Sequence, residues 1–190
     1  IPSINPTGQY SPLKLARVVA YKVLAHAEIE FYFEERVKDV ALEAKRQWDN
    51  TSSINRTLLC LLAFSGQMME EPPKTLTPSR GSRTLAPEKI KVSRKIDISI
   101  NSFMKVIKEN HGVKEANLLA LLLPIGISTD DLDPIFLATM NSFGEQRGRF
   151  AHSSAATYQT QQPPDPQNEL SNITQILSYI SDIDQLISAL

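Results

Sequence analysis

The sequence predicts a mostly α-helical protein, an all-α fold, organised as a single domain over residues 1–190. Apolar residues recur at three- and four-residue steps over long stretches, which is the spacing of one helix face. The chain has only 7 glycines, and 42% of its residues are hydrophobic against 22% charged. That composition at a length of 190 residues suits one globular domain with a buried core.

Two helices are predicted in the first third of the chain, after an irregular lead-in over residues 1–11. The first covers about residues 13–48, and residues 49–53 predict a stop followed by a new helix start. The second covers about residues 54–69 and is apolar on most faces, which favours a central place in the core. The apolar residues at helical spacing in the first helix are Leu13, Ala16, Ala20, Val23, Ala27, Phe31, Val37, Ala41, Ala44 and Trp48.

Residues 71–92 form a Pro-rich basic loop in this interpretation, because four prolines there interrupt regular structure. Residues 74–95 hold seven basic side chains and one acid, Glu88, which gives a local charge of +6. The stretch is either a solvated loop or an electrostatic arm that holds the backbone of RNA. The basic residues are Lys74, Arg80, Arg83, Lys89, Lys91, Arg94 and Lys95.

Four more helices are predicted in the second half of the chain. They cover about residues 93–109, residues 114–123, a segment from about residue 135 to residue 152, and an amphipathic C-terminal segment. A polar, proline-bearing loop over residues 153–168 separates the last two. The stripe of the last helix consists of Leu170, Ile173, Leu177, Ile180, either Ile183 or Asp184, Ile187 and Leu190.

Composition excludes several classes of function. The formal net charge of −1 argues against a generally basic nucleic-acid binder, so contacts to RNA must come from local patches. The single cysteine, Cys60, excludes an internal disulfide and a cysteine-based zinc site, and predicts a small buried thiol in a reducing, cytoplasmic setting. No apolar run is long enough to span a membrane, and no signal-peptide pattern begins the chain. Phosphate-loop and dinucleotide motifs are absent, so no cofactor is expected.

The strongest chemical feature is the pair Arg147 and His152. Histidine exchanges a proton near neutral pH, and arginine binds phosphate oxygens with a planar fork of donors. Five residues of an α-helix turn through about 500°, so the two side chains point about 140° apart. They converge either if the helix ends or distorts near His152, or if two copies of the helix meet across a two-fold axis.

The segment Arg147-Gly148-Arg149-Phe150-Ala151-His152 resembles the Arg-x4–6-His signature of the HEPN superfamily. The long first helix and the helical segments before the motif are most similar to the RiboL-PSP-HEPN branch. This resemblance implies a HEPN-like helical bundle and a metal-independent endoribonuclease that leaves 2′,3′-cyclic phosphate ends. It also implies a homodimer with a composite active site, and a toxin or a defence or stress effector with a neutralising antitoxin or neighbouring domain as a partner.

Residue type suggests the roles in such a site. His152 would transfer protons, and Arg147 would stabilise charge on the phosphate in the transition state. Active HEPN nucleases often carry Asn, Asp or His directly after the arginine, whereas this chain has Gly148. Arg149 would partly replace that group, and Glu30 on the first helix would orient the arginine or the histidine.

The same residues also fit interpretations in which they have no functional role. Arg147 and His152 also fit a surface arginine and a histidine stabilised by a helix end, and Glu30 fits a solvated helix face that includes Glu28, Glu34 and Glu35. The three histidines lack metal-ligand spacing, so no metal site is predicted. The main alternative function is a non-catalytic HEPN domain that binds RNA or dimerises with a protein. A third alternative is a helical scaffold without affinity for nucleic acid.

Overall fold

The computed structural model describes residues 10–69, 71, 91–152 and 165–190, with only the backbone of residues 149–152. These residues form six α-helices and one 3-10 turn, and the described part contains no strand, which confirms the all-α prediction. The elements are α1 (Pro12–Thr51), α2 (Arg56–Phe64), α3 (Val92–Lys108), α4 (Glu115–Ile125), η2 (Thr129–Asp131), α5 (Pro134–His152) and α7 (Pro166–Ser188).

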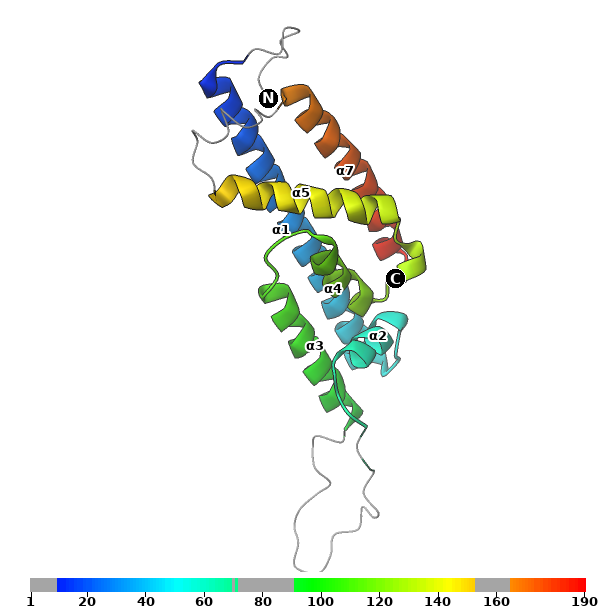
Figure 1. The fold of residues 1–190 in the computed structure, drawn as a ribbon. Helices are drawn as coiled ribbons and strands as arrows, with labels where there is room; N and C mark the ends of the chain where they lie inside the picture. Colours follow the sequence, from blue (N-terminus) through cyan, green and yellow to red (C-terminus); the bar gives the residue numbers. More distant parts are fainter. Residues whose placement is uncertain (1–9, 70, 72–90, 153–164) are drawn as a thin grey trace, which may run out of the picture.

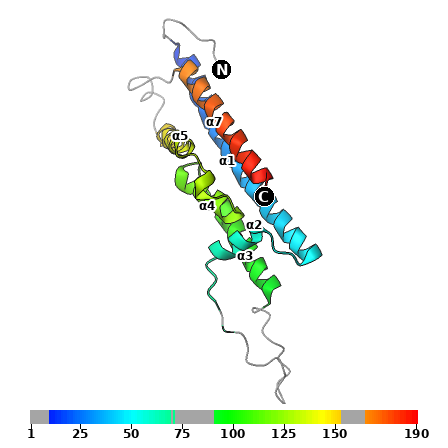
Figure 2. The same ribbon diagram turned by 90° about the vertical axis from the view of Figure 1, so that its right-hand side faces the viewer.

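The 40-residue helix α1 is the longest helix of the described residues, and the other five α-helices pack against it (Figure 1). Its start is capped by Ser11, whose side chain accepts a hydrogen bond from the backbone N–H of Lys14, and Pro12 occupies the first turn. Helices α2, α3 and α4 pack around the C-terminal half of α1. Helix α7 lies alongside α1, and α5 crosses both of them, as the two views together show (Figures 1 and 2).

The buried face of α1 differs from the predicted one in its N-terminal half. Val37, Ala41 and Ala44 are buried as predicted, but Leu13 and Phe31 are more than 60% exposed. The buried residues before position 37 are Val18, Lys22, His26, Ile29 and Phe33. The predicted stripe was wrong there because two of the residues that face the core, Lys22 and His26, are polar. A search for apolar residues at helical spacing does not include such residues.

Helix α2 is shorter and more peripheral than predicted. It begins after the cap residue Asn55 and ends at Phe64, and the described residues 67–69 are not helical. Thr57, Leu58 and Leu61 are buried, whereas Leu59 and Phe64 are exposed, so α2 covers one side of the core. Cys60 on this helix is half-buried, whereas the sequence predicted a buried thiol.

Two other predicted boundaries were wrong, and proline explains both. Helix α4 continues through Pro124 to Ile125, because a proline in the last turn still fits helical geometry when the chain ends at a left-handed Gly126. Helix α7 begins at Pro166, inside the predicted loop over residues 153–168. The side chain of Asp165 caps it by accepting from the N–H of Gln167, and Pro166 occupies the first turn.

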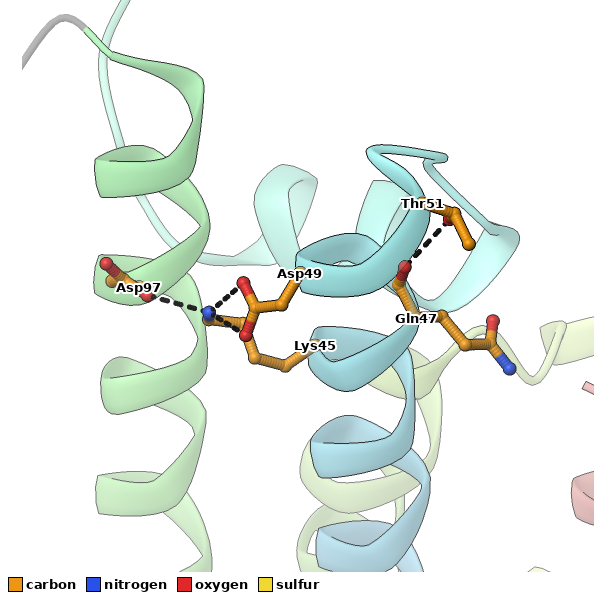
Figure 3. Close-up of polar contacts among 5 residues, drawn as sticks. All are labelled: Lys45, Gln47, Asp49, Thr51 and Asp97. Atoms are coloured by element: carbon orange, nitrogen blue, oxygen red, sulfur yellow. Dashed lines mark hydrogen bonds and ion pairs between the residues drawn. The ribbon is translucent and has the colours of Figure 1, made fainter.

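An ion network fixes the C-terminal end of α1 against α3 (Figure 3). The ammonium Nζ of Lys45 lies 2.6 Å from both carboxylate oxygens of Asp49 and 3.3 Å from Oδ1 of Asp97 on α3. Two residues beyond Asp49, the hydroxyl of Thr51 donates to the carbonyl oxygen of Gln47 at 2.8 Å. These partly exposed contacts define where α1 ends and contribute little to stability individually.

Among the helices that the structure describes, none is sufficiently long and apolar to cross a membrane.

Candidate functional site

A stripe of polar residues follows one face of α1 at four-residue steps: Lys22, His26, Glu30 and Glu34. Residues four apart on an α-helix lie one above the other, so this α1 polar stripe is continuous. Lys22 and His26 are buried, whereas Glu30 and Glu34 are only half-buried. The stripe therefore runs from the interior, where α5 crosses α1 (Figure 1), toward the surface.

Lys22 joins three helices at the inner end of the stripe. Its side chain is 2% exposed, and its Nζ lies 2.8 Å from Oε1 and 2.7 Å from Oε2 of Glu169 on α7. The same ammonium donates to the amide oxygen of Gln146 on α5. A buried charge is tolerated only when it is paired and hydrogen bonded, so this contact fixes α5 and α7 against α1.

His26 lies one turn further along, packed under α5. Its ring faces the ring of Phe143, with the centroids 5.4 Å apart, and its side chain is 2% exposed. Burial lowers the pKa of the imidazole from 6.5 to about 4, and the nearby charge of Arg147 contributes to the lowering. His26 is therefore a neutral side chain at physiological pH.

Arg147 lies on α5 four residues after Phe143 and is half-buried. Its positive charge lowers the pKa of both His26 and Glu30. Within the described part of the chain, its guanidinium forms no ion pair or hydrogen bond. The donors that suit a phosphate group are therefore not used by a neighbouring carboxylate.

Two acidic residues complete the outer part of the stripe. Burial raises the pKa of Glu30, and the charge of Glu34 raises it further, while Arg147 and His111 oppose the shift. Glu34 accepts a hydrogen bond of 2.8 Å from the side-chain amide of Asn110, at the turn between α3 and α4. The site thus draws on α1, α5 and the α3–α4 turn.

The structure brings some of the predicted site residues together and separates others. Arg147 lies close enough to Glu30 for its positive charge to lower the pKa of that carboxyl. Lys91, Arg94 and Lys95 lie at the start of α3, at the opposite end of the molecule from α5 (Figures 1 and 2). The side chains of Arg149 and His152, and residues Arg80, Arg83 and Lys89, lie outside the described residues. The pairing of Arg147 with His152 therefore stays a prediction.

Sequence reasoning missed the buried part of the site. Lys22, Gln146 and Asn110 were not candidates, and His26 was considered only among the three histidines that lack metal-ligand spacing. The signal that could have identified Lys22 and His26 is the four-residue step from Lys22 to Glu34, which places four ionisable side chains on one face. Among the described residues, no group of three or more His, Cys, Asp or Glu side chains could hold a metal ion.

A scan against protein families matches the RiboL-PSP-HEPN model over residues 4–190. The chain belongs to the RiboL-PSP-HEPN family. HEPN domains are often ribonucleases, so membership supports an RNA-related function. Searches of curated proteins and of solved structures found no match.

Gly148 is the point at which this RiboL-PSP-HEPN chain departs from the motif described above. The position is helical, and a β-carbon built on it would meet no atom within 4 Å, so the structure leaves room for a side chain. A glycine in the middle of a helix is therefore not required here by packing.

We expect Gly148→Ala to stabilise the protein by about 0.5–1 kcal/mol, because alanine loses less backbone entropy in a helix. Urea unfolding of parent and variant measures the difference. Gly144→Ala is the matched control, because a β-carbon at Gly144 would lie 2.7 Å from the side chain of Lys114. A loss of stability in Gly148→Ala as large as in the control would contradict the open environment.

His26 is expected to make the protein less stable as the pH falls from 6.5 to about 4. In that window the unfolded chain binds a proton on this imidazole while the native chain does not, so protons favour unfolding. Glu30, with its raised pKa, acts in the opposite direction. Unfolding free energies measured across the window should therefore vary less steeply with pH in His26→Gln than in the parent. Equal slopes would show that the native imidazole titrates normally.

Proposed function

We propose that the chain is a metal-independent endoribonuclease in which Arg147 binds the phosphodiester that is cleaved. The observation that carries this proposal is the half-buried guanidinium of Arg147, which has no carboxylate partner among the described residues and lies beside ionisable side chains of α1. Family membership and the spacing from Arg147 to His152 support it.

In the proposed reaction the 2′-hydroxyl of a ribose attacks the adjacent phosphorus. A base removes the proton of the 2′-hydroxyl, the new O2′–P bond forms, and the bond from phosphorus to the 5′-oxygen breaks. The leaving 5′-oxygen receives a proton, so the products are a 2′,3′-cyclic phosphate and a 5′-hydroxyl. His152 would transfer protons, and Arg147 would stabilise the negative charge that develops on the phosphate oxygens.

The proposal is tested by incubating cellular RNA with the protein in EDTA, beside the variants Arg147→Ala and His152→Ala. Cleavage by the parent that both variants lose, with cyclic phosphate ends, is the expected result. DNA of the same sequence should stay intact because it lacks the 2′-hydroxyl. An intact RNA sample with folded parent protein would instead favour the alternative of a non-catalytic RNA-binding or dimerisation domain, for which Gly148 is the specific indication.

We also propose a homodimer whose two copies of Arg147 and His152 share one cleft. The exposed apolar stripe of α1, formed by Leu13, Leu24 and Phe31, is turned about 105–175° around the helix from Lys22, His26 and Glu30. That stripe would not bring two copies of Arg147 together. The interface of the proposed dimer would therefore include the side of the molecule that carries Arg147.

Mixing two inactive variants separates a shared cleft from a site within one chain. In a mixed dimer of Arg147→Ala and His152→Ala, one chain supplies the arginine and the other supplies the histidine. We expect the mixture to regain part of the cleavage activity that each variant lacks alone. A mixture as inactive as its components, or a protein that sediments with the mass of one chain, would contradict the shared cleft.

The position of the basic residues limits the proposed RNA contacts. Lys91, Arg94 and Lys95 lie at the start of α3, which is the end of that helix away from α5 and its residue Arg147 (Figure 2). One RNA strand would therefore have to extend along the molecule to contact both regions of one chain. The biological role that we propose, a toxin or a defence or stress effector with a neutralising partner, rests on the family resemblance alone.

A further inference from the structure

The buried imidazole of His26 has an unsatisfied ring nitrogen. Within the described residues, Nδ1 has no hydrogen-bond partner, and it lies 3.4 Å from Oε2 of Glu30, one helical turn further along α1. An unmatched buried polar atom costs about 1–3 kcal/mol, so nearly all such atoms are paired in native proteins. One proton held between Nδ1 and Oε2 would satisfy both atoms with little movement.

Every element that packs around this pair contributes a charge. On α1, Glu34 raises the pKa of Glu30, and Lys22 is neutralised by Glu169 of α7. From α5, the charge of Arg147 lowers the pKa of both His26 and Glu30. From the α3–α4 turn, His111 lowers the pKa of Glu30. Arg147 is therefore the one group among these that disfavours a proton on both members of the pair.

A phosphodiester at Arg147 would reverse this effect. Its negative charge would offset the guanidinium charge, and a negative charge within about 4–6 Å typically raises the proton affinity of neighbouring groups by about 1–3 pKa units. Both members of the pair would then bind a proton more tightly. Glu30, once protonated, would no longer repel the negatively charged phosphate.

We propose that His26 and Glu30 form a proton-accepting pair beside Arg147, so that binding of a phosphodiester at Arg147 is coupled to uptake of one proton by the pair. The inference rests on the proposed function for its ligand class, the RNA backbone, but it does not require cleavage. His26 and Glu30 are positioning residues in this scheme, because they act on the phosphate through Arg147.

The coupling has a defined sign. A ligand whose binding takes up a proton binds more tightly as the pH falls, by up to about tenfold per pH unit when the uptake is complete. In the free protein the pKa of His26 is about 4, so the effect belongs to the weakly acidic range above that value. Near pH 8 the affinity should no longer depend on the pair, because neither group then carries the proton in either state.

The first test needs no nucleic acid. NMR titration of the His26 ring in the parent should give a pKa far below 6.5, and Arg147→Met should raise that pKa. Met is chosen because it keeps the length of the side chain and removes its charge. Arg46→Met is the matched control, since Arg46 is 68% exposed and pairs with Glu43 on the far half of α1. An unchanged His26 pKa in Arg147→Met would overturn the inference.

The second test measures proton uptake directly. A 2′-O-methyl RNA strand, which binds but has no free 2′-hydroxyl, is titrated into the protein at about pH 5.5 in two buffers of different ionisation enthalpy. The parent should take up protons, and Glu30→Gln and His26→Gln should bind the strand with that uptake strongly reduced. His152→Asn and His111→Gln should retain it. Uptake that survives in Glu30→Gln, or that disappears only in His152→Asn, would overturn the inference.

The outcomes separate the inference from the proposed function. Cleavage of RNA without linked proton uptake would overturn the inference but would still support the proposed ribonuclease activity. Proton uptake that depends on Glu30, without cleavage of unmodified RNA, would support the inference and contradict the proposed ribonuclease activity. A strand that binds Arg147→Ala as tightly as the parent would overturn the inference, because the inference requires a phosphate bound at Arg147. The ribonuclease would then be judged by the rate of cleavage alone.

Discussion

Replacing Arg147 with alanine is expected to lower the rate of RNA cleavage by about 10²–10³-fold, the usual effect of removing one preorganised donor to a developing negative charge. We expect this loss because the guanidinium of Arg147 has no carboxylate partner among the described residues, so its donors can bind the phosphate oxygens. The loss should appear mainly in kcat, because the charge on the phosphate oxygens is largest in the transition state. Single-turnover cleavage of a defined RNA strand measures it.

Two further variants make this result specific. Arg147→Lys keeps the charge but loses the planar fork, so we expect it to recover only part of the rate. Arg46→Ala removes an exposed arginine from the other end of α1 and should leave the rate unchanged. An Arg147→Ala protein that is folded and cleaves RNA within about threefold of the parent would show that another group stabilises the transition state.

Replacing Glu169 with methionine is expected to destabilise the protein by about 3–5 kcal/mol. The substitution removes the carboxylate that holds the ammonium of Lys22, a side chain that is 2% exposed. Removing one member of a buried ion pair takes away the attraction that offset the desolvation of the other charge, and this costs more than the pair contributes. Urea unfolding followed by circular dichroism measures the change in the free energy of unfolding.

The double variant Lys22→Met with Glu169→Met distinguishes a buried charge from lost packing. It removes both charges, so its stability should return to within about 1–2 kcal/mol of the parent. Glu145→Met is the surface control, because Glu145 is exposed on α5 and accepts a hydrogen bond from Asn141. If the double variant is as unstable as Glu169→Met alone, the cost comes from lost packing and the ion pair is not its cause.

The class of fold was predictable because most helices bury an apolar face. In α7, Ile173, Ile180 and Ile187 follow the predicted stripe and are buried, whereas Leu170 and Leu177 of that stripe are exposed. In the C-terminal half of α1, Val37 and Ala41 do the same. The hydrophobic effect dominates in these segments, so residue type and helical period are sufficient to locate the buried face.

The N-terminal half of α1 could not be predicted by that rule, because its core-facing residues include a lysine and a histidine. Lys22 is buried where Glu169 and Gln146, which are more than 120 residues away in the sequence, are among its partners. A pattern within one helix contains no information about such partners. The apolar residues Leu24 and Phe31 are consequently left on the exposed face.

The candidate site was partly predictable for the same reasons. Arg147 and Glu30 were identified from residue type and spacing, and in the structure the charge of Arg147 lowers the pKa of Glu30. The role of His26 depends on the crossing of α5 over α1, which puts Phe143 against its ring. That crossing is a tertiary feature, so the depressed pKa of His26 had no signal in the sequence.

The most direct test of the ribonuclease proposal uses a DNA strand that carries one ribonucleotide, incubated with the protein in EDTA. We expect a single cut on the 3′ side of that ribonucleotide, with a 2′,3′-cyclic phosphate on one product and a 5′-hydroxyl on the other. Cuts elsewhere in the strand, or cleavage that appears only when a divalent metal is added, would contradict it.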